Sequence, residues 1–389
     1  MRQLSFQIEA LAPLAFPERK PGVQFNASLP YVPGAAIYGA LGQQIGPDDF
    51  DATLFRDLRC HNAYPDRADD LWVRPLPATA IKPKGAEPNT QLRDSLYERL
   101  CWAMQEPTAL IYAPTDDDGR PWEAAGSPFY TLNAEHQVAA REVQQRMLTR
   151  VAINRQRGTA QDGRLYSPLV ISEVQSKTMT STTFLGNLVV PDESYDEISA
   201  ALQAITHLGA RQTTGLGAVK IELASTTQPN DAPEMIMRRV SAMTRRFQDQ
   251  AAFYEQLGGK PWPIAASSIF TLNLLSDAIL LENGWLPTQE LSPQLLEEAT
   301  GIKATLLRSF TTTKTVGGFH SLWQRPKPAE VAVAMGGLYV YLADVPLTSE
   351  DCVQLAQLQL EGIGERRAEG FGQLRICEDF HVPDWESYP

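Results

Sequence analysis

The sequence is poor in cysteine, and its few cysteines are widely separated. Cys60, Cys101, Cys352 and Cys377 are the only ones, and no two of them form a C-x-x-C pair. Zinc ribbons and redox dithiols need such pairs, and small disulfide-stapled domains need a much higher cysteine content. We therefore expect no zinc site and no disulfide framework, and interpret the thiols as buried or incidental groups in a reducing cytoplasm.

Long apolar runs are also missing. No stretch of about 18 or more apolar residues occurs, so no membrane-spanning helix and no membrane partner are predicted. The first residues, MRQLSFQIEALAPLAF, lack a charged segment followed by a continuous apolar run, which is the pattern of a secretion signal. These absences indicate a cytoplasmic protein.

Residue patterns of metal sites and of common catalytic sites are absent as well. None of the five histidines belongs to an H-x-x-x-H pair, and no G-x-S-x-G elbow occurs. We predict no metal, no cofactor and no catalytic residue. His207 and His320 remain possible general bases for RNA cleavage, against the simpler interpretation of surface or capping histidines.

The sequence does contain a duplicated glycine-rich segment. Residues 208–221, LGARQTTGLGAVKI, align without a gap on residues 363–376, IGERRAEGFGQLRI. Each copy follows a predicted helix and leads into a predicted strand, whereas a dinucleotide-binding fingerprint follows a strand and opens a helix. A phosphate-binding P-loop would end in Gly-Lys-Ser/Thr, which neither copy does. The pattern therefore predicts a repeated helix–loop–strand unit.

Glycines allow backbone N–H groups to approach a phosphate closely, and arginine adds charge-assisted hydrogen bonds. On this basis we predict RNA binding by the two loops, at Gly209, Arg211, Gly215 and Gly217 in the first and at Gly364, Arg366, Arg367, Gly370 and Gly372 in the second. The alternative is that the glycines only permit tight turns before an edge strand.

The distribution of charge along the sequence also favours RNA binding. Acidic residues outnumber basic ones by 46 to 34, and a net charge of −12 argues against polyanion binding over the whole surface. Two windows without acids depart from this balance. Residues 143–161 hold Arg146, Arg150, Arg155 and Arg157, and residues 299–329 hold Lys303, Arg308, Lys314, Arg325 and Lys327 with Phe310, Phe319, His320 and Trp323. Cations interleaved with aromatic rings are typical of single-stranded nucleic-acid binding, so we add Arg150, Arg155, Arg157, Lys314, His320 and Trp323 to the predicted RNA site.

The order of predicted elements indicates an α+β fold. Each half starts with a strand, near residues 4–8 and 268–275, and ends helix–loop–strand. We predict two tandem ferredoxin-like βαββαβ units with antiparallel sheets, at residues 1–226 and 263–389. A linker and connecting helix would span residues 227–262, and a large insertion would occupy about 46–135 of the first unit.

At this point the sequence resembles the RAMP superfamily of CRISPR RNA-binding proteins. Residues 363–372 resemble its C-terminal glycine-rich loop, and residues 31–41, YVPGAAIYGAL, are similar to a segment near the start of type III members. The stretch 150–186, with Arg155, is similar to their mid-domain pattern, and residues 317–328 resemble a segment of the larger two-unit subunits. The family segment usually carries Ser and Arg where this chain has Ala36 and Tyr38.

The resemblance implies a subunit of a type III CRISPR effector complex, of subtype III-D. Its two-unit relatives hold the 5′ repeat-derived handle of the crRNA and contact the large polymerase-like subunit and the backbone RAMP subunits. Such subunits are not nucleases. Two other hypotheses stay open: a metal-independent endoribonuclease that processes precursor crRNA, and a scaffold subunit that binds no RNA.

Overall fold

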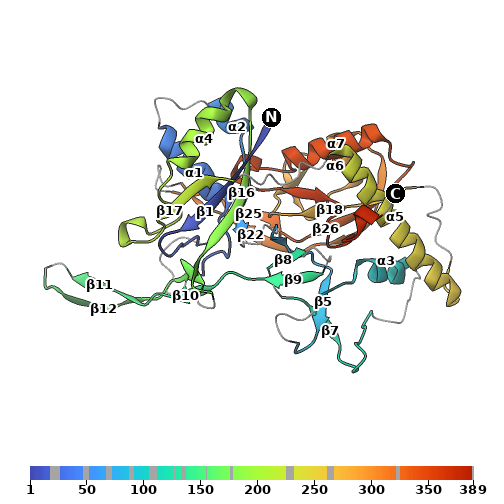
Figure 1. Ribbon diagram of the computed structural model, residues 1–389, viewed down its shortest axis with the longest axis horizontal. Helices are drawn as coiled ribbons and strands as arrows, with labels where there is room; N and C mark the ends of the chain where they lie inside the picture. The colour runs from blue at the N-terminus through green and yellow to red at the C-terminus, as the bar shows by residue number, and fades with distance from the viewer. Residues whose placement is uncertain are drawn as a thin grey trace.

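The structure is a computed structural model in which two antiparallel sheets lie side by side (Figure 1). It describes residues 1–17, 27–46, 52–66, 72–86, 92–104, 112–126, 128–132, 137–154, 156–175, 178–224, 232–260, 267–320 and 325–387. The predicted fold class, α+β with antiparallel sheets, is confirmed.

The first sheet has the strand order β17-β1-β16-β2, with β3 also pairing with β16. Its elements, in chain order, are β1 (Arg2–Ala10), α1 (Gly34–Ile45), α2 (Ala52–Asp57), β2 (Arg59–Cys60), β3 (Tyr64–Pro65), β16 (Thr183–Val190), the short helix η1 (Asp192–Ser194), α4 (Tyr195–Gln203) and β17 (Val219–Leu223). Alternation along β1 places Phe6 and Ile8 in the core, where Ile37 of α1 and Leu202 of α4 also lie. The two helices therefore cover one face of this sheet.

The second sheet repeats this arrangement, with the strand order β21-β26-β18-β27. Its elements are β18 (Ile269–Leu274), α6 (Pro293–Thr300), β21 (Ala304–Phe310), β26 (Leu338–Ala343), α7 (Ser349–Glu361) and β27 (Leu374–Ile376). In both sheets the first strand lies between the third and the fourth, and helices follow the first and third strands, which is the βαββαβ order. The helix α5 (Pro233–Gln256) joins the two units and packs Val240 and Phe247 into the second core.

The insertion in the first unit differs from the expected range of about 46–135. Residues 59–60 and 64–65 pair with β16, so they belong to the first sheet, and the inserted residues lie between β3 and β16. The inserted elements are β4 (Arg74–Pro75), β5 (Ala80–Pro83), β6 (Arg93–Asp94), α3 (Leu96–Met104), β7 (Trp122–Ala124), β8 (Phe129–Leu132), β9 (Val138–Arg141), β10 (Gln145–Met147), β11 (Arg150–Asn154), β12 (Thr159–Tyr166), β13 (Leu169–Ile171), β14 (Val174–Gln175) and β15 (Thr180–Ser181). Two-residue strands carry no periodicity of their own, which is why the boundary was wrong.

Each unit also carries a β-ladder that continues into a hairpin. In the first unit β10 pairs with β13, and the hairpin β11–β12 projects from the body on the left of Figure 1. In the second unit β22 (Thr313–Val316) pairs with β25 (Glu330–Val333), and β23 (Phe319–His320) pairs with β24 (Arg325–Pro326). In the sheet itself β21 pairs with β26, and β19 (Leu280–Glu282) with β20 (Leu286–Thr288) forms a further hairpin.

Candidate nucleic-acid interface

The two glycine-rich loops, loop 1 (residues 208–217) and loop 2 (residues 363–372), have the same backbone conformation. Four matched pairs of residues have positive φ: 85° and 74° at Gly209 and Gly364, 63° and 55° at Arg211 and Arg366, 81° and 91° at Gly215 and Gly370, 88° and 72° at Gly217 and Gly372. A short 3₁₀ turn follows each arginine, η2 (Gln212–Thr214) in loop 1 and η3 (Arg367–Glu369) in loop 2. The sequence repeat is therefore a repeat of structure.

The same hydrogen bonds hold each loop against the segment that follows the first strand of its unit. In loop 1, Gly217 N donates to Pro13 O at 2.9 Å and Ala210 N to Ala15 O at 2.9 Å. In loop 2, Gly372 N donates to Asp277 O at 2.8 Å and Glu365 N to Ile279 O at 2.9 Å. Two of these donors, Gly217 and Gly372, are predicted RNA-binding residues, and their N–H groups are hydrogen-bonded to protein carbonyls.

Loop 2 is covered by the first unit. A Cβ atom on Gly370 would lie 2.5 Å from Cys60 O and 3.1 Å from Gly34 Cα, so protein backbone occupies the space in front of this glycine. The turn η3 packs against α1 and β2. The side of Gly370 that a Cβ would occupy is therefore covered by protein, and loop 2 joins the two units at this point.

Arg366 forms ion pairs with two acidic side chains. Its guanidinium lies 2.8 Å from Glu330 Oε2 and 2.8 Å from Glu369 Oε2, and its side chain is 15% exposed. Lys327 Nζ donates to Glu369 Oε2 at 2.5 Å. Burial by itself would raise the pKa of Glu369, but the hydrogen bonds from Arg366 and Lys327 hold that pKa below its usual value. The cluster is internally neutralised, so an RNA phosphate at Arg366, the predicted contact, would compete with these carboxylates.

The remaining residues of loop 2 differ in their exposure to solvent. Gly372 is buried, Gly364 is exposed, and Arg367 is half-buried with its guanidinium 3.7 Å from Glu361. The nearby helix start of α1 is also covered, since a Cβ on Gly34 would lie 3.0 Å from Glu369 O. Tyr38 packs edge-on against Phe55 at 5.4 Å between ring centroids, consistent with a helix start that contacts protein.

Loop 1 is open. Residues 212–215 are exposed, and a Cβ on Gly215 would meet no heavy atom within 4 Å. Gly209 and Gly217 are less accessible, because Gly209 approaches Phe16 and Ala15, and Gly217 is buried. The first loop thus presents its turn and its arginine to the outside, unlike the second.

The hairpin β11–β12, which we call the arm, begins directly beside loop 1. Arg150 Nη1, at the base of the arm, donates to Thr214 O at 2.5 Å. The Arg211 guanidinium lies over the ring of Tyr166, the residue paired with Arg150, at 4.8 Å from its centroid. Within the described residues neither Arg150 nor Arg211 forms an ion pair with a carboxylate. Arg157 is exposed at the turn of the arm.

The predicted residues of the second basic window do not join this surface. Lys314 pairs with Asp277 at 2.8 Å, so its charge is compensated. His320 is exposed on β23, in the hairpin of the second unit. Arg155 and Trp323 lie outside the residues that the structure describes. The structure therefore brings Arg150 and Arg211 together beside Gly215, and places Arg157 at the far end of the arm.

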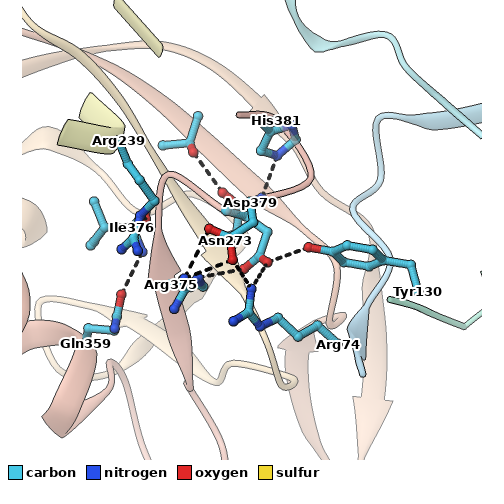
Figure 2. A network of polar contacts seen from close by, with 11 residues as sticks. Arg74, Tyr130, Arg239, Asn273, Gln359, Arg375, Ile376, Asp379 and His381 are labelled. Carbon is cyan, nitrogen blue, oxygen red and sulfur yellow. Dashed lines mark hydrogen bonds and ion pairs between the residues drawn. The ribbon is translucent and has the colours of Figure 1, made fainter. Parts of the chain in front are cut away.

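Sequence reasoning missed a buried polar network between the insertion and the second unit (Figure 2). Arg74 Nη1, on β4, lies 2.8 Å from Glu378 Oε1 and 2.6 Å from Asp379 Oδ2, which follow β27. Arg375 Nη2 lies 3.0 Å from the same Asp379 oxygen. Burial would raise the pKa of Asp379, but the charges of Arg375 and Arg74 hold it far below its usual value. No sequence motif links residues about 300 positions apart.

The side chains that could bind a metal or transfer a proton are scattered in the described part of the chain. No group of three or more His, Cys, Asp or Glu side chains that could hold a metal occurs in the described part of the chain. His207 is exposed beside loop 1, with its Nδ1 3.1 Å from Thr206 Oγ1, and His381 is buried between Asp94 and Asn273. No helix among the described residues is both long enough and apolar enough to span a membrane. All four cysteines are free and buried.

Comparison with solved structures finds similar chains in CRISPR complexes. A chain of the type III-B Cmr-beta complex bound to cognate target RNA and AMPPnP shares 11% identity, with 86% of each chain covered and a TM-score of 0.43. The same complex bound to cognate target RNA gives 12% identity, 86% coverage of each chain and a TM-score of 0.42. A chain of a type IV-B CRISPR complex shares 13% identity over 58% of this chain and 92% of that one, with a TM-score of 0.27.

No curated protein matches the chain by sequence. The sequence profile of the RAMP superfamily, however, matches residues 20–220, which include loop 1, the arm and most of the first unit. This match spans more than half of the 389 residues. The chain belongs to the RAMP superfamily.

Proposed function

We propose that this protein is an RNA-binding subunit of a type III CRISPR effector complex and holds the 5′ repeat-derived handle of the crRNA. The observation that carries the proposal is the open surface formed by loop 1 and the arm. Arg150 and Arg211 lie there beside the ring of Tyr166, and Arg157 is exposed at the turn of the arm, on a chain whose net charge is −12. Local cations on an acidic protein favour a specific polyanion contact over general adhesion.

The geometry suits a single strand. Arg150 and Arg211 already have neutral partners, a backbone carbonyl and the ring of Tyr166, which hold their guanidinium groups in place. The remaining N–H groups of both guanidinium groups could donate hydrogen bonds to phosphate oxygens without displacing a carboxylate. The arginine side of loop 1, beside Tyr166, is where a single-stranded backbone would pass.

The finer parts of the proposal rest on the sequence motifs that resemble type III members. They are subtype III-D, docking to the large polymerase-like subunit, and contacts with backbone RAMP subunits. We also propose that the chain binds crRNA without cleaving it. The exposed His207 is the one described histidine beside the open loop, so it is the residue to change when cleavage is tested.

The test is a titration of labelled RNA carrying a repeat-derived 5′ sequence, with binding measured by fluorescence anisotropy at several salt concentrations. The triple variant Arg150→Ala, Arg157→Ala, Arg211→Ala should bind about tenfold more weakly or worse. Loss of three phosphate contacts should also lower the salt slope by about 2, since each single-strand contact contributes roughly 0.7.

Arg238→Ala is the matched control, because Arg238 is an exposed arginine on α5, away from the arm. Equal affinities of the triple variant and the control would reject the loop 1 site. RNA cut in the presence of chelator, with cleavage lost in His207→Ala, would instead support the endoribonuclease hypothesis. Absence of RNA binding in the wild-type protein would support the scaffold hypothesis.

A further inference from the structure

Each glycine-rich loop has two sides, and loop 2 shows what each side contacts. The Arg366 guanidinium turns toward its own unit, where it meets Glu330 and lies 4.7 Å from the centroid of the Phe371 ring. The turn η3 and Gly370 face the other way and pack on α1 and β2 of the first unit. One side of loop 2 thus contacts the β22–β25 ladder of its own unit, and the other side packs against the first ferredoxin-like unit.

The joint between loop 2 and the first unit is backbone against backbone. Gly370 lies against Cys60 O and Gly34 Cα, and Gly34 lies against Glu369 O, so both partners need a residue without a side chain. The Gly34 N–H is fixed by Asn62 Oδ1 at 2.8 Å, which orients the helix start toward the loop. This seat, formed by Gly34, Cys60 and Asn62, recognises the shape of the turn.

Loop 1 presents the same turn with no unit against it. Its φ angles match those of loop 2, residues 212–215 are exposed, and Arg211 turns toward Tyr166 of the arm as Arg366 turns toward Phe371. The RNA surface proposed above uses the arginine side. The turn side, made of Gln212, Thr213, Thr214 and Gly215, carries no charge, and apart from the hydrogen bond from Arg150 to Thr214 O its described surroundings leave Gly215 in open space.

We propose that the turn at residues 212–215 docks another protein subunit of ferredoxin-like fold. That subunit would offer a glycine at the start of its first helix and an adjacent strand, as Gly34 and Cys60 do for loop 2. The turn of loop 1 is uncharged, whereas η3 carries Arg367 and Glu369. We therefore expect the surface that receives the turn of loop 1 to be uncharged as well. The inference rests on the proposed function, because it requires a complex with several subunits.

A second copy of this chain is a poorer fit than a different subunit. The Gly34 seat of each copy is already filled by its own loop 2. The corresponding helix of the second unit, α6, begins with Pro293, whose ring would stand where the joint tolerates no side chain. The occupant is therefore a related subunit with a free glycine seat.

The test is site-specific photocrosslinking in the assembled complex. All four native cysteines are buried, so Thr213→Cys introduces one reactive thiol, which is labelled with a benzophenone maleimide. Tagged full-length protein is purified with its complex from the cells that make it, irradiated and analysed by mass spectrometry. Gln248→Cys, at an exposed position of α5, is the matched control.

The expected adduct joins residue 213 to the first-helix start, or the strand beside it, of a different ferredoxin-like subunit, at least several-fold above the control. An adduct to RNA, an adduct to a second copy, or no adduct above the control would each overturn the docking proposal. RNA content is measured in the same preparation. RNA without an adduct overturns the docking proposal alone, whereas the docking adduct without RNA supports docking and overturns crRNA binding.

Discussion

Gly215 and Gly370 share one backbone conformation but have different surroundings, and this difference should be measurable. Both have φ near 80–90°, so an Ala at either position is strained by about 1 kcal/mol. At Gly370 the new methyl group must also displace Cys60 O, at 2.5 Å, while at Gly215 it enters open space. We expect Gly370→Ala to lower the free energy of unfolding by about 3 kcal/mol and Gly215→Ala by about 1 kcal/mol.

Chemical denaturation of the two variants, with RNA titration of the same preparations, checks this expectation. Gly370→Ala should lose RNA binding only in proportion to its unfolded fraction, because Gly370 faces protein. Equal destabilisation by the two substitutions would mean that loop 2 is not seated on the first unit.

At the residue scale, the sequence revealed the loops but not their surroundings. The repeat identified Gly209, Arg211 and their counterparts because spacing survives in a single sequence. It could not show that Glu330 neutralises Arg366 or that Cys60 faces Gly370, since these contacts join residues far apart in the chain. Two loops with one pattern therefore received one predicted role, and the structure assigns them different surroundings.

At the element scale, none of the described side chains of the arm belongs to a hydrophobic core, so the fold should survive its removal. Arg150 pairs with Tyr166 across the hairpin, which makes this pair a suitable place for a shorter turn. Replacing residues 151–165 by Asn-Gly should leave the melting temperature within about 3 °C of the wild type, because few buried contacts are lost. It should weaken RNA binding through the loss of Arg157.

Differential scanning fluorimetry and the anisotropy titration measure both effects. A cooperative transition lowered by more than about 10 °C would show that the arm stabilises the body. Full retention of RNA affinity would restrict the RNA surface to loop 1 and the base of the arm.

Long elements were predictable from the sequence and short ones were not. The connecting helix expected within residues 227–262 spans Pro233–Gln256. Its apolar residues recur with helical periodicity, which makes such a helix predictable. Helix α7 begins at Ser349 with Thr348 as its cap, because the Thr348 hydroxyl accepts a hydrogen bond from Asp351 N and Asp351 accepts one from Thr348 N. The two-residue strands β2 and β3 are defined by their pairing with β16. Two residues are too few to show the alternation that identifies a strand in a sequence, so these strands could not be predicted.

At the scale of the whole molecule, the boundary between the units is polar and sensitive to acid. A cavity of about 60 Å³ lies there, lined by His61, Asn187, Gln373 and Arg375 among others. Burial, aided by the charge of Arg59, lowers the pKa of His61 to about 4. His61 therefore stays neutral in the folded protein at pH values where the unfolded chain already carries a proton.

The sign of the pH effect follows from this difference. Below about pH 6.5 the unfolded state binds a proton that folded His61 does not, so the free energy of unfolding falls as the pH drops toward 4. At pH 5 the loss from this residue is about 2 kcal/mol. His61→Gln should remove this part, and melts at pH 7 and pH 5 measure it against the exposed control His320→Gln. An identical pH dependence in both variants would contradict the role of His61.

The way loop 2 closes over the first unit also has a consequence for synthesis on the ribosome. The first sheet can be completed once residue 223 has emerged, but the Gly34 seat stays bare until residues 363–372 follow. During that interval the nascent chain exposes the surface that a turn of this shape recognises. A related subunit synthesised nearby could occupy the seat first, so the arrival of the chain's own loop is the step that commits it to correct assembly.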